Sequence, residues 1–167
     1  IIAGPKATIH WNNKTNNSRS YWQIRSNAIE LSGNLISSYF DLFTNERGKN
    51  REIFGVKYSQ YARSDIDLSY TFVWDENNSL AYRFNTGIGL PYGNTEFLPF
   101  ERRFFVGGGN SLRAWRPRTL GPGGYRDSTN AITIEKTGEI LLQTSAEYRF
   151  DIIDKLIDGA VFIDAGN

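Results

Sequence analysis

Residue types that could catalyse a reaction or bind a metal are scarce in this sequence. His10 is the only histidine, and the chain contains no cysteine. It falls in a run that predicts a strand, so we expect an ordinary wall residue rather than a metal ligand. A Ser/His/Asp arrangement cannot be assembled around one histidine near the start of the chain. The sequence therefore predicts neither an enzyme nor a bound metal or cofactor.

Nucleotide and nucleic-acid binding are not expected either. Three consecutive glycines occupy Gly107–Gly109. Phosphate-binding glycine loops join a strand to a helix and carry a Lys-Ser/Thr pair, and neither feature accompanies these glycines. The 19 basic residues balance 18 acidic ones, and no basic run is present that would follow a nucleic-acid backbone.

Apolar and polar residues alternate with a period of two along much of the chain, which predicts strands. The clearest runs are Ile66–Asp75 and Leu80–Leu90, and the short Glu76–Asn78 between them predicts an antiparallel hairpin. A phase change near Ala28–Ile29 indicates either a β-bulge or a misplaced strand boundary. Five less regular runs predict further strands, giving seven in all: Lys6–Trp11, Tyr21–Gly33, Glu52–Ala62, Glu139–Phe150 and Gly159–Asn167.

Strand length favours a membrane barrel over a soluble sheet. The runs of 10 to 12 residues exceed the usual soluble strand of about 5 to 6 and suit the roughly 9 to 11 that cross a bilayer. A content of 14% aromatic residues fits the aromatic girdles of such barrels. On periodicity alone a soluble β-sandwich remains the alternative. In a barrel, lipid would contact Leu68, Tyr70, Phe72, Trp74, Leu80, Tyr82, Phe84 and Ile88, and the lumen would contact Asp67, Asp75, Arg83 and Asn85.

The connections between these strands fall into two classes, as strands that alternate across a membrane require. Glu76–Asn78 and Asp151–Asp158 are short, whereas Pro91–Thr129 is nearly forty residues long and rich in Gly, Pro and Arg. A loop of that length is usually functional. The intermediate connection Asn34–Arg51 contains Leu35–Phe43, which predicts a short amphipathic helix on the short-turn side.

The long loop contains the motif Val-Gly-Gly-Gly-Asn-Ser-Leu-Arg-Ala-Trp at 106–115, followed by Leu-Gly-Pro at 120–122. It resembles the sixth extracellular loop of the BamA/TamA (bacterial surface antigen) family, where a Gly-Gly turn precedes Val-Arg-Gly-Phe/Tyr and Leu/Ile-Gly-Pro follows. Thr137–Phe150 and Phe162–Gly166 resemble the strands that follow this loop in the family. The matching loop positions are Gly107, Gly108, Leu112, Ala114, Trp115, Gly121 and Pro122.

In that family the loop folds back into the barrel, and its arginine meets acidic side chains on the inner wall. The resemblance therefore implies that Arg113 pairs with Glu147 and Asp164. Ordering a long loop costs roughly 1–2 kcal/mol per residue, and the fork of an arginine can engage carboxylates from two strands at once. The alternatives are a solvated loop arginine and an ordinary lumen-facing Glu147. Ala114 stands where the family usually has glycine, so it would be strained if that backbone needed a positive φ.

The resemblance implies an all-β fold, an antiparallel transmembrane β-barrel of sixteen strands. Residues 1–167 would be a fragment of the C-terminal barrel domain, with about seven strands and the sixth extracellular loop at about 91–129, after periplasmic POTRA domains. The Leu-Arg-Ala-Trp and Leu-Gly-Pro-Gly motifs also resemble TamA-like members from Bacteroidetes-type bacteria.

The function implied by the family is insertion of other proteins into the bacterial outer membrane, or their translocation across it, without nucleotide hydrolysis. The expected partners are outer-membrane lipid, unfolded outer-membrane client proteins, and accessory lipoproteins or periplasmic proteins. A two-partner secretion pore is the alternative within the family. A passive porin-like channel is the alternative from another class, although a porin does not require an arginine-tipped loop opposite Glu147 and Asp164.

Overall fold

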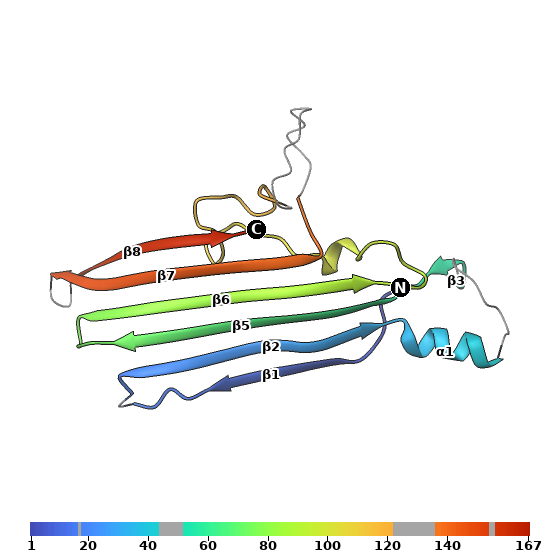
Figure 1. Cartoon of the computed structure of the whole chain (residues 1–167), viewed down its shortest axis with the longest axis horizontal. Helices are drawn as coiled ribbons and strands as arrows, with labels where there is room; N and C mark the ends of the chain where they lie inside the picture. The colour runs from blue at the N-terminus through green and yellow to red at the C-terminus, as the bar shows by residue number, and fades with distance from the viewer. Residues whose placement is uncertain (17, 44–51, 122–135, 154–155) are drawn as a thin grey trace.

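The computed structural model describes residues 1–16, 18–43, 52–121, 136–153 and 156–167. Six strands form one antiparallel sheet, in which each strand pairs with the strand of the sheet that follows it in the chain (Figure 1). This up-and-down order is that of a barrel wall, so the predicted fold class is confirmed. The strands are β1 (Lys6–Asn12), β2 (Ser20–Ser32), β5 (Tyr61–Val73), β6 (Asn78–Pro91), β7 (Ile140–Ile153) and β8 (Ile157–Gly166).

The predicted hairpin is confirmed in β5 and β6, which have 13 and 14 residues. Leu68 lies opposite Phe84 and Tyr70 lies opposite Tyr82, so the apolar side chains of the two strands share one face. This face includes the residues predicted to contact lipid. Trp74 lies just beyond β5 and extends the same face, because its ring packs edge-on against Phe72 at 5.1 Å.

Aromatic side chains gather on this apolar face near the end where the short turns lie. The ring of Trp74 is 5.9 Å from that of Tyr148 on β7. The ring of Trp22 on β2 is 4.6 Å from that of Tyr70 on β5. A row of aromatic rings across several strands is the pattern that barrels place at a membrane interface.

The opposite face is polar and carries Asp67, Arg83 and Asn85, as predicted. Asp75 lies beyond the end of the strand. β5 ends at Val73, and the Asp75 carboxylate accepts hydrogen bonds in the following turn, at 2.9 Å from the backbone N–H of Asn77 and from the amide of Asn78. These bonds, that of Asn78 first, lower the pKa of Asp75. The predicted strand is therefore too long at this end, and Asp75 is a turn residue rather than a wall residue.

The prediction of a membrane-spanning strand at Glu52–Ala62 is also wrong. The segment contains only a small ribbon, β3 (Glu52–Ile53) paired with β4 (Val56–Lys57), before β5 begins. Apolar residues occur here for another reason, since Tyr58 is buried in the connection at 1% exposure and Tyr61 already begins β5. A packed connection therefore imitated the pattern of a strand.

Because of this extra predicted strand, the helix predicted at Leu35–Phe43 was assigned to the wrong end of the sheet. The amphipathic helix is confirmed as α1 (Asn34–Phe43), but Figure 1 shows it at the end opposite the short turns, together with β3 and the start of the long loop. One spurious strand had inverted the direction assigned to every strand before it. Within the described ranges, no helix is long and apolar enough to cross a membrane.

The predicted bulge in β2 is confirmed. Asn27 pairs with Asp65 and Glu30 pairs with Arg63, so two residues of β2 lie opposite Ser64 alone on β5. A bulge of this kind changes the face to which the following side chains point. After the bulge, Glu30 points to the polar face.

The long loop lies against the polar face, beginning with the short helix η1 (Phe100–Arg102). Glycines on β6 make room for it. A Cβ atom on Gly87 would lie 2.6 Å from the ring of Phe104, and one on Gly89 would lie 2.2 Å from Leu98. The buried apolar cluster therefore forms between loop and wall, and it comprises Phe104, Val106, Leu112 and Leu141 with Leu120 packed against them.

Candidate functional site

The tip of the loop depends on glycine. Gly107 has φ +100°, and a Cβ atom there would lie 2.3 Å from the carbonyl oxygen of Arg116. Both the backbone conformation and this close approach exclude a side chain. The N–H of Gly108 donates to the carbonyl of Trp115 at 2.8 Å, which closes the tip into a compact turn.

Arg113 lies in the last turn of this tip. The N–H of Trp115 donates to the carbonyl of Leu112 at 3.1 Å, so Arg113 and Ala114 are the two central residues of this turn. Among the described non-glycine residues only Phe54 and Arg118 have a positive φ. The strain anticipated at Ala114 therefore does not arise, and alanine fits this position.

The Arg113 guanidinium binds carboxylates on both following strands. Its Nε donates to Asp164 Oδ2 at 2.9 Å and its Nη2 donates to Asp164 Oδ1 at 2.7 Å, a bidentate pair. The backbone N–H of Arg113 also donates to Asp164 Oδ2, at 3.1 Å. Its Nη1 donates to Glu147 Oε2 on β7. The structure thus brings together the three residues that the motif had singled out.

These three residues, called the Arg113 anchor below, are shielded from solvent, and their charges are balanced. The side chains of Arg113, Asp164 and Glu147 are 24%, 7% and 18% exposed. Arg149 Nε donates to the other oxygen of Glu147 at 2.6 Å, so two cations face two carboxylates. The hydrogen bonds with Asp164, and then those with Glu147, raise the pKa of Arg113 above its ordinary value. The guanidinium remains charged throughout the accessible pH range.

Phe162 is a part of the anchor that sequence reasoning missed. The guanidinium carbon of Arg113 lies 3.5 Å from the centroid of its ring, a cation–π contact. Phe162 precedes Asp164 by two residues on β8, so both side chains point to the same face. Period-two spacing from Asp164 could have identified it.

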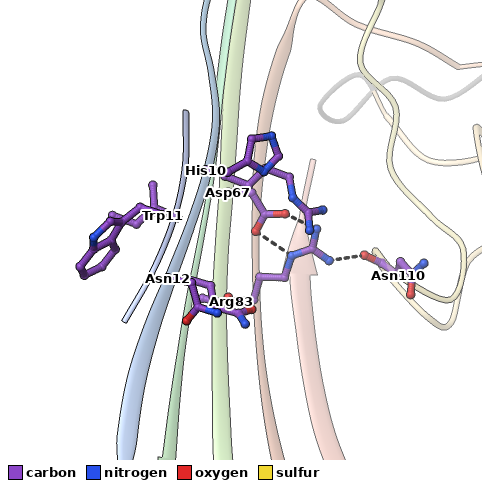
Figure 2. A pocket seen from close by; sticks show the side chains of 10 residues that line it. His10, Trp11, Asn12, Asp67, Arg83 and Asn110 are labelled. Atoms are coloured by element: carbon purple, nitrogen blue, oxygen red, sulfur yellow. Dashed lines mark hydrogen bonds and ion pairs between the residues drawn. The ribbon is translucent and has the colours of Figure 1, made fainter. Parts of the chain in front are cut away.

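A second wall arginine binds the backbone of the loop. Arg83 Nε and Nη2 donate to Asp67 Oδ1 and Oδ2 at 2.9 and 2.5 Å. Arg83 Nη1 donates to the carbonyl oxygen of Asn110 at 2.6 Å, and Figure 2 shows Arg83 reaching from the wall to the loop turn. Asp67 thus holds Arg83 in place while Arg83 fixes the turn before the motif arginine.

The next residue of the loop adds a neutral contact. The Ser111 hydroxyl accepts a hydrogen bond from the N–H of Gly107 at 3.0 Å and donates to Gln143 Oε1 on β7 at 2.9 Å. Gln143 is only 4% exposed, so this bond satisfies a buried amide oxygen. The tip is therefore hydrogen-bonded to three strands of the wall, β6, β7 and β8.

The family comparison covers the loop and the strands beneath it. The model of the Omp85 superfamily domain matches residues 33–167, which include the loop and the strands that it contacts. The chain belongs to the Omp85 superfamily. Superfamily members are outer-membrane β-barrel proteins of Gram-negative bacteria or organelles, and their general role is protein insertion or translocation.

The other motif positions of this Omp85 domain differ in their surroundings. Leu112 is buried in the cluster beneath the loop, whereas Trp115 is half exposed. Gly121 is buried with φ +90°. Pro122, like the predicted loop end at Thr129, lies outside the described residues.

His10 lies on the same polar face of the Omp85 wall and lines an open hollow with Arg25, Asp67 and Asn110 (Figure 2). In the part of the chain that the structure describes, no group of three or more His, Cys, Asp or Glu side chains is placed to hold a metal ion.

Proposed function

We propose that this chain forms part of a BamA/TamA-type barrel that helps other proteins insert into, or cross, the bacterial outer membrane without nucleotide hydrolysis. The observation that carries the proposal is the anchored loop. Arg113 joins the loop tip to Asp164 and Glu147 on two adjacent strands. An ordered loop inside the wall gives the barrel a fixed internal element, on which the shape and the seam of the barrel can depend.

Physical chemistry offers a route to insertion that consumes no nucleotide. A barrel with a weak seam exposes a strand edge, whose free N–H and C=O groups can pair with an incoming strand. In this proposal the anchored loop holds the wall in a shape that leaves this strand edge able to pair with a client strand. The clients would be unfolded outer-membrane proteins, and the further partners would be outer-membrane lipid and accessory lipoproteins or periplasmic proteins.

The long-loop end would face the cell exterior, as the sixth extracellular loop does in the family that the motif resembles. The Leu-Arg-Ala-Trp and Leu-Gly-Pro-Gly motifs support a TamA-like member from a Bacteroidetes-type bacterium within this proposal.

The test is replacement of the native gene by Arg113→Ala, Arg113→Lys or Arg116→Gln in the full-length protein, followed by quantification of folded outer-membrane proteins. Arg116 is the matched control because it is an exposed arginine of the same loop. We expect Arg113→Ala to deplete many folded outer-membrane proteins, Arg113→Lys to deplete fewer of them, and Arg116→Gln to have no effect. Depletion of one secreted partner alone would instead indicate a two-partner secretion pore.

A further inference from the structure

The β2 bulge brings a buried glutamate beneath the first part of the long loop, Leu98–Phe104, called its root below. Glu30 is 5% exposed. Without the extra residue at the bulge, Glu30 would follow the alternation of Ser26 and point to the apolar face. The bulge instead pairs Glu30 with Arg63 and places it on the face that carries the loop.

Glu30 is surrounded by one hydroxyl and three cations from three separate elements. The hydroxyl of Tyr61 on β5 donates to Glu30 Oε1 at 2.7 Å. Nε of Arg102, in η1 of the loop, lies 3.3 Å from the same oxygen. On the other oxygen, Arg63 Nη1 and Lys6 Nζ lie at 3.8 and 3.9 Å. Arg102 is the only one of these groups that belongs to the loop.

This ionic cluster adjoins the apolar seat of the loop root. Arg102 lies between Leu98 and Phe104 in the sequence, and these two side chains fill the spaces above Gly89 and Gly87. The guanidinium carbon of Arg63 lies 4.2 Å from the centroid of the Phe104 ring, so one cation contacts both the carboxylate and the loop aromatic.

We infer that Glu30 is a positioning residue for the loop, which fixes its root through Arg102 independently of the Arg113 anchor at its tip. The two anchors share no side chain. The root is held by β1, β2 and β5, and the tip charges are held by β7 and β8. The tip can therefore be released while the root stays in place. The inference rests on the proposed function only for its effect on client assembly.

The charges around Glu30 determine how its replacement affects the root of the loop. Glu30 and Asp65 are the carboxylates of the cluster, and Lys6, Arg63 and Arg102 are its cations, with Arg63 Nη2 at 3.3 Å from Asp65 Oδ1. Replacing Glu30 by glutamine would leave three cations near a single carboxylate. Arg102 would then be repelled as well as unpaired, so the root should lift from the wall.

The inference is tested by electron paramagnetic resonance distances in the full-length protein in outer-membrane vesicles. One spin label replaces Glu101 at the root and the second replaces Glu76 in the short turn, both exposed residues. The variants are Arg102→Gln, Arg102→Lys, Glu30→Gln and the double variant, with Arg116→Gln as the control. Arg102 is 37% exposed in its side chain, so its variants remain informative if Glu30→Gln fails to fold.

We expect one narrow distance population in the parent and in Arg116→Gln. Arg102→Gln should add a second population at longer distance, and Arg102→Lys should largely restore the first. The double variant should be no worse than the more affected single variant, because both changes break the same contact. An unchanged distance in Arg102→Gln, or strictly additive effects in the double variant, would overturn the inference. Neither readout depends on client assembly, so failure of the proposed function would be seen separately.

Discussion

Removal of the motif arginine should release the tip of the loop without unfolding the wall. Arg113→Ala deletes a bidentate pair with Asp164, a hydrogen bond to Glu147 and the contact with Phe162. Breaking a buried ion pair by removing one partner costs about 3–5 kcal/mol. Arg113 is 24% exposed, so we expect the lower end, about 3 kcal/mol. That value corresponds to a decrease of about 100-fold in the ratio of anchored to released tip.

The assay is again a distance between spin labels, now at Arg116 near the tip and at Glu76. We expect a released population in Arg113→Ala and a smaller one in Arg113→Lys, because lysine keeps the charge but lacks the bidentate fork. Arg25→Ala is the matched control, since Arg25 is an exposed arginine on the same face of the wall. An Arg113→Ala distribution identical to that of the control would refute the reasoning.

Three further predictions concern the wall and the loop. Phe84→Arg should destabilise the barrel by about 2–4 kcal/mol in denaturant unfolding, and Phe72→Arg by only about 0–1 kcal/mol, because Phe72 lies near the interface; equal effects would contradict the assigned depths. Gly87→Ala should destabilise by about 1–3 kcal/mol, because its Cβ would meet the Phe104 ring at 2.6 Å, whereas Gly109→Ala, with open space around it, should be neutral. Trypsin added to intact cells should cleave slowly after Arg118 in the parent and faster in Arg113→Ala, whereas the bond after Arg116 is resistant because Pro117 follows it; rapid cleavage of the parent would indicate a free surface loop.

Period-two alternation was sufficient to predict the hairpin and its two faces, because β5 and β6 are exposed to different surroundings on each side. It failed at Glu52–Ala62, where Tyr58 is buried in a connection and Tyr61 already belongs to β5. That failure also moved α1 to the wrong end. Alternation reports burial, and it cannot distinguish a strand face from a packed loop.

The charged contacts of the loop were predictable only in part. Arg113, Glu147 and Asp164 lie in motifs whose order and spacing could be matched to a family. Arg83 was predicted to face the lumen, but its contact with the loop is made to the backbone carbonyl of Asn110, which has no signature in sequence. Glu30 was hidden because the bulge reverses its face, and the contact with Arg102 depends on how the root of the loop folds.

The most direct test of the central claim is a reconstitution of the full-length protein in liposomes with an unfolded outer-membrane client and no nucleotide. The fraction of client that becomes folded and membrane-integrated is measured over time, with ion conductance recorded in parallel. We predict that the parent accelerates client folding, that Arg113→Ala loses most of this acceleration, and that Arg113→Lys retains part of it. Conductance without any acceleration of client folding by the parent, or equal acceleration by the parent and Arg113→Ala, would contradict the account.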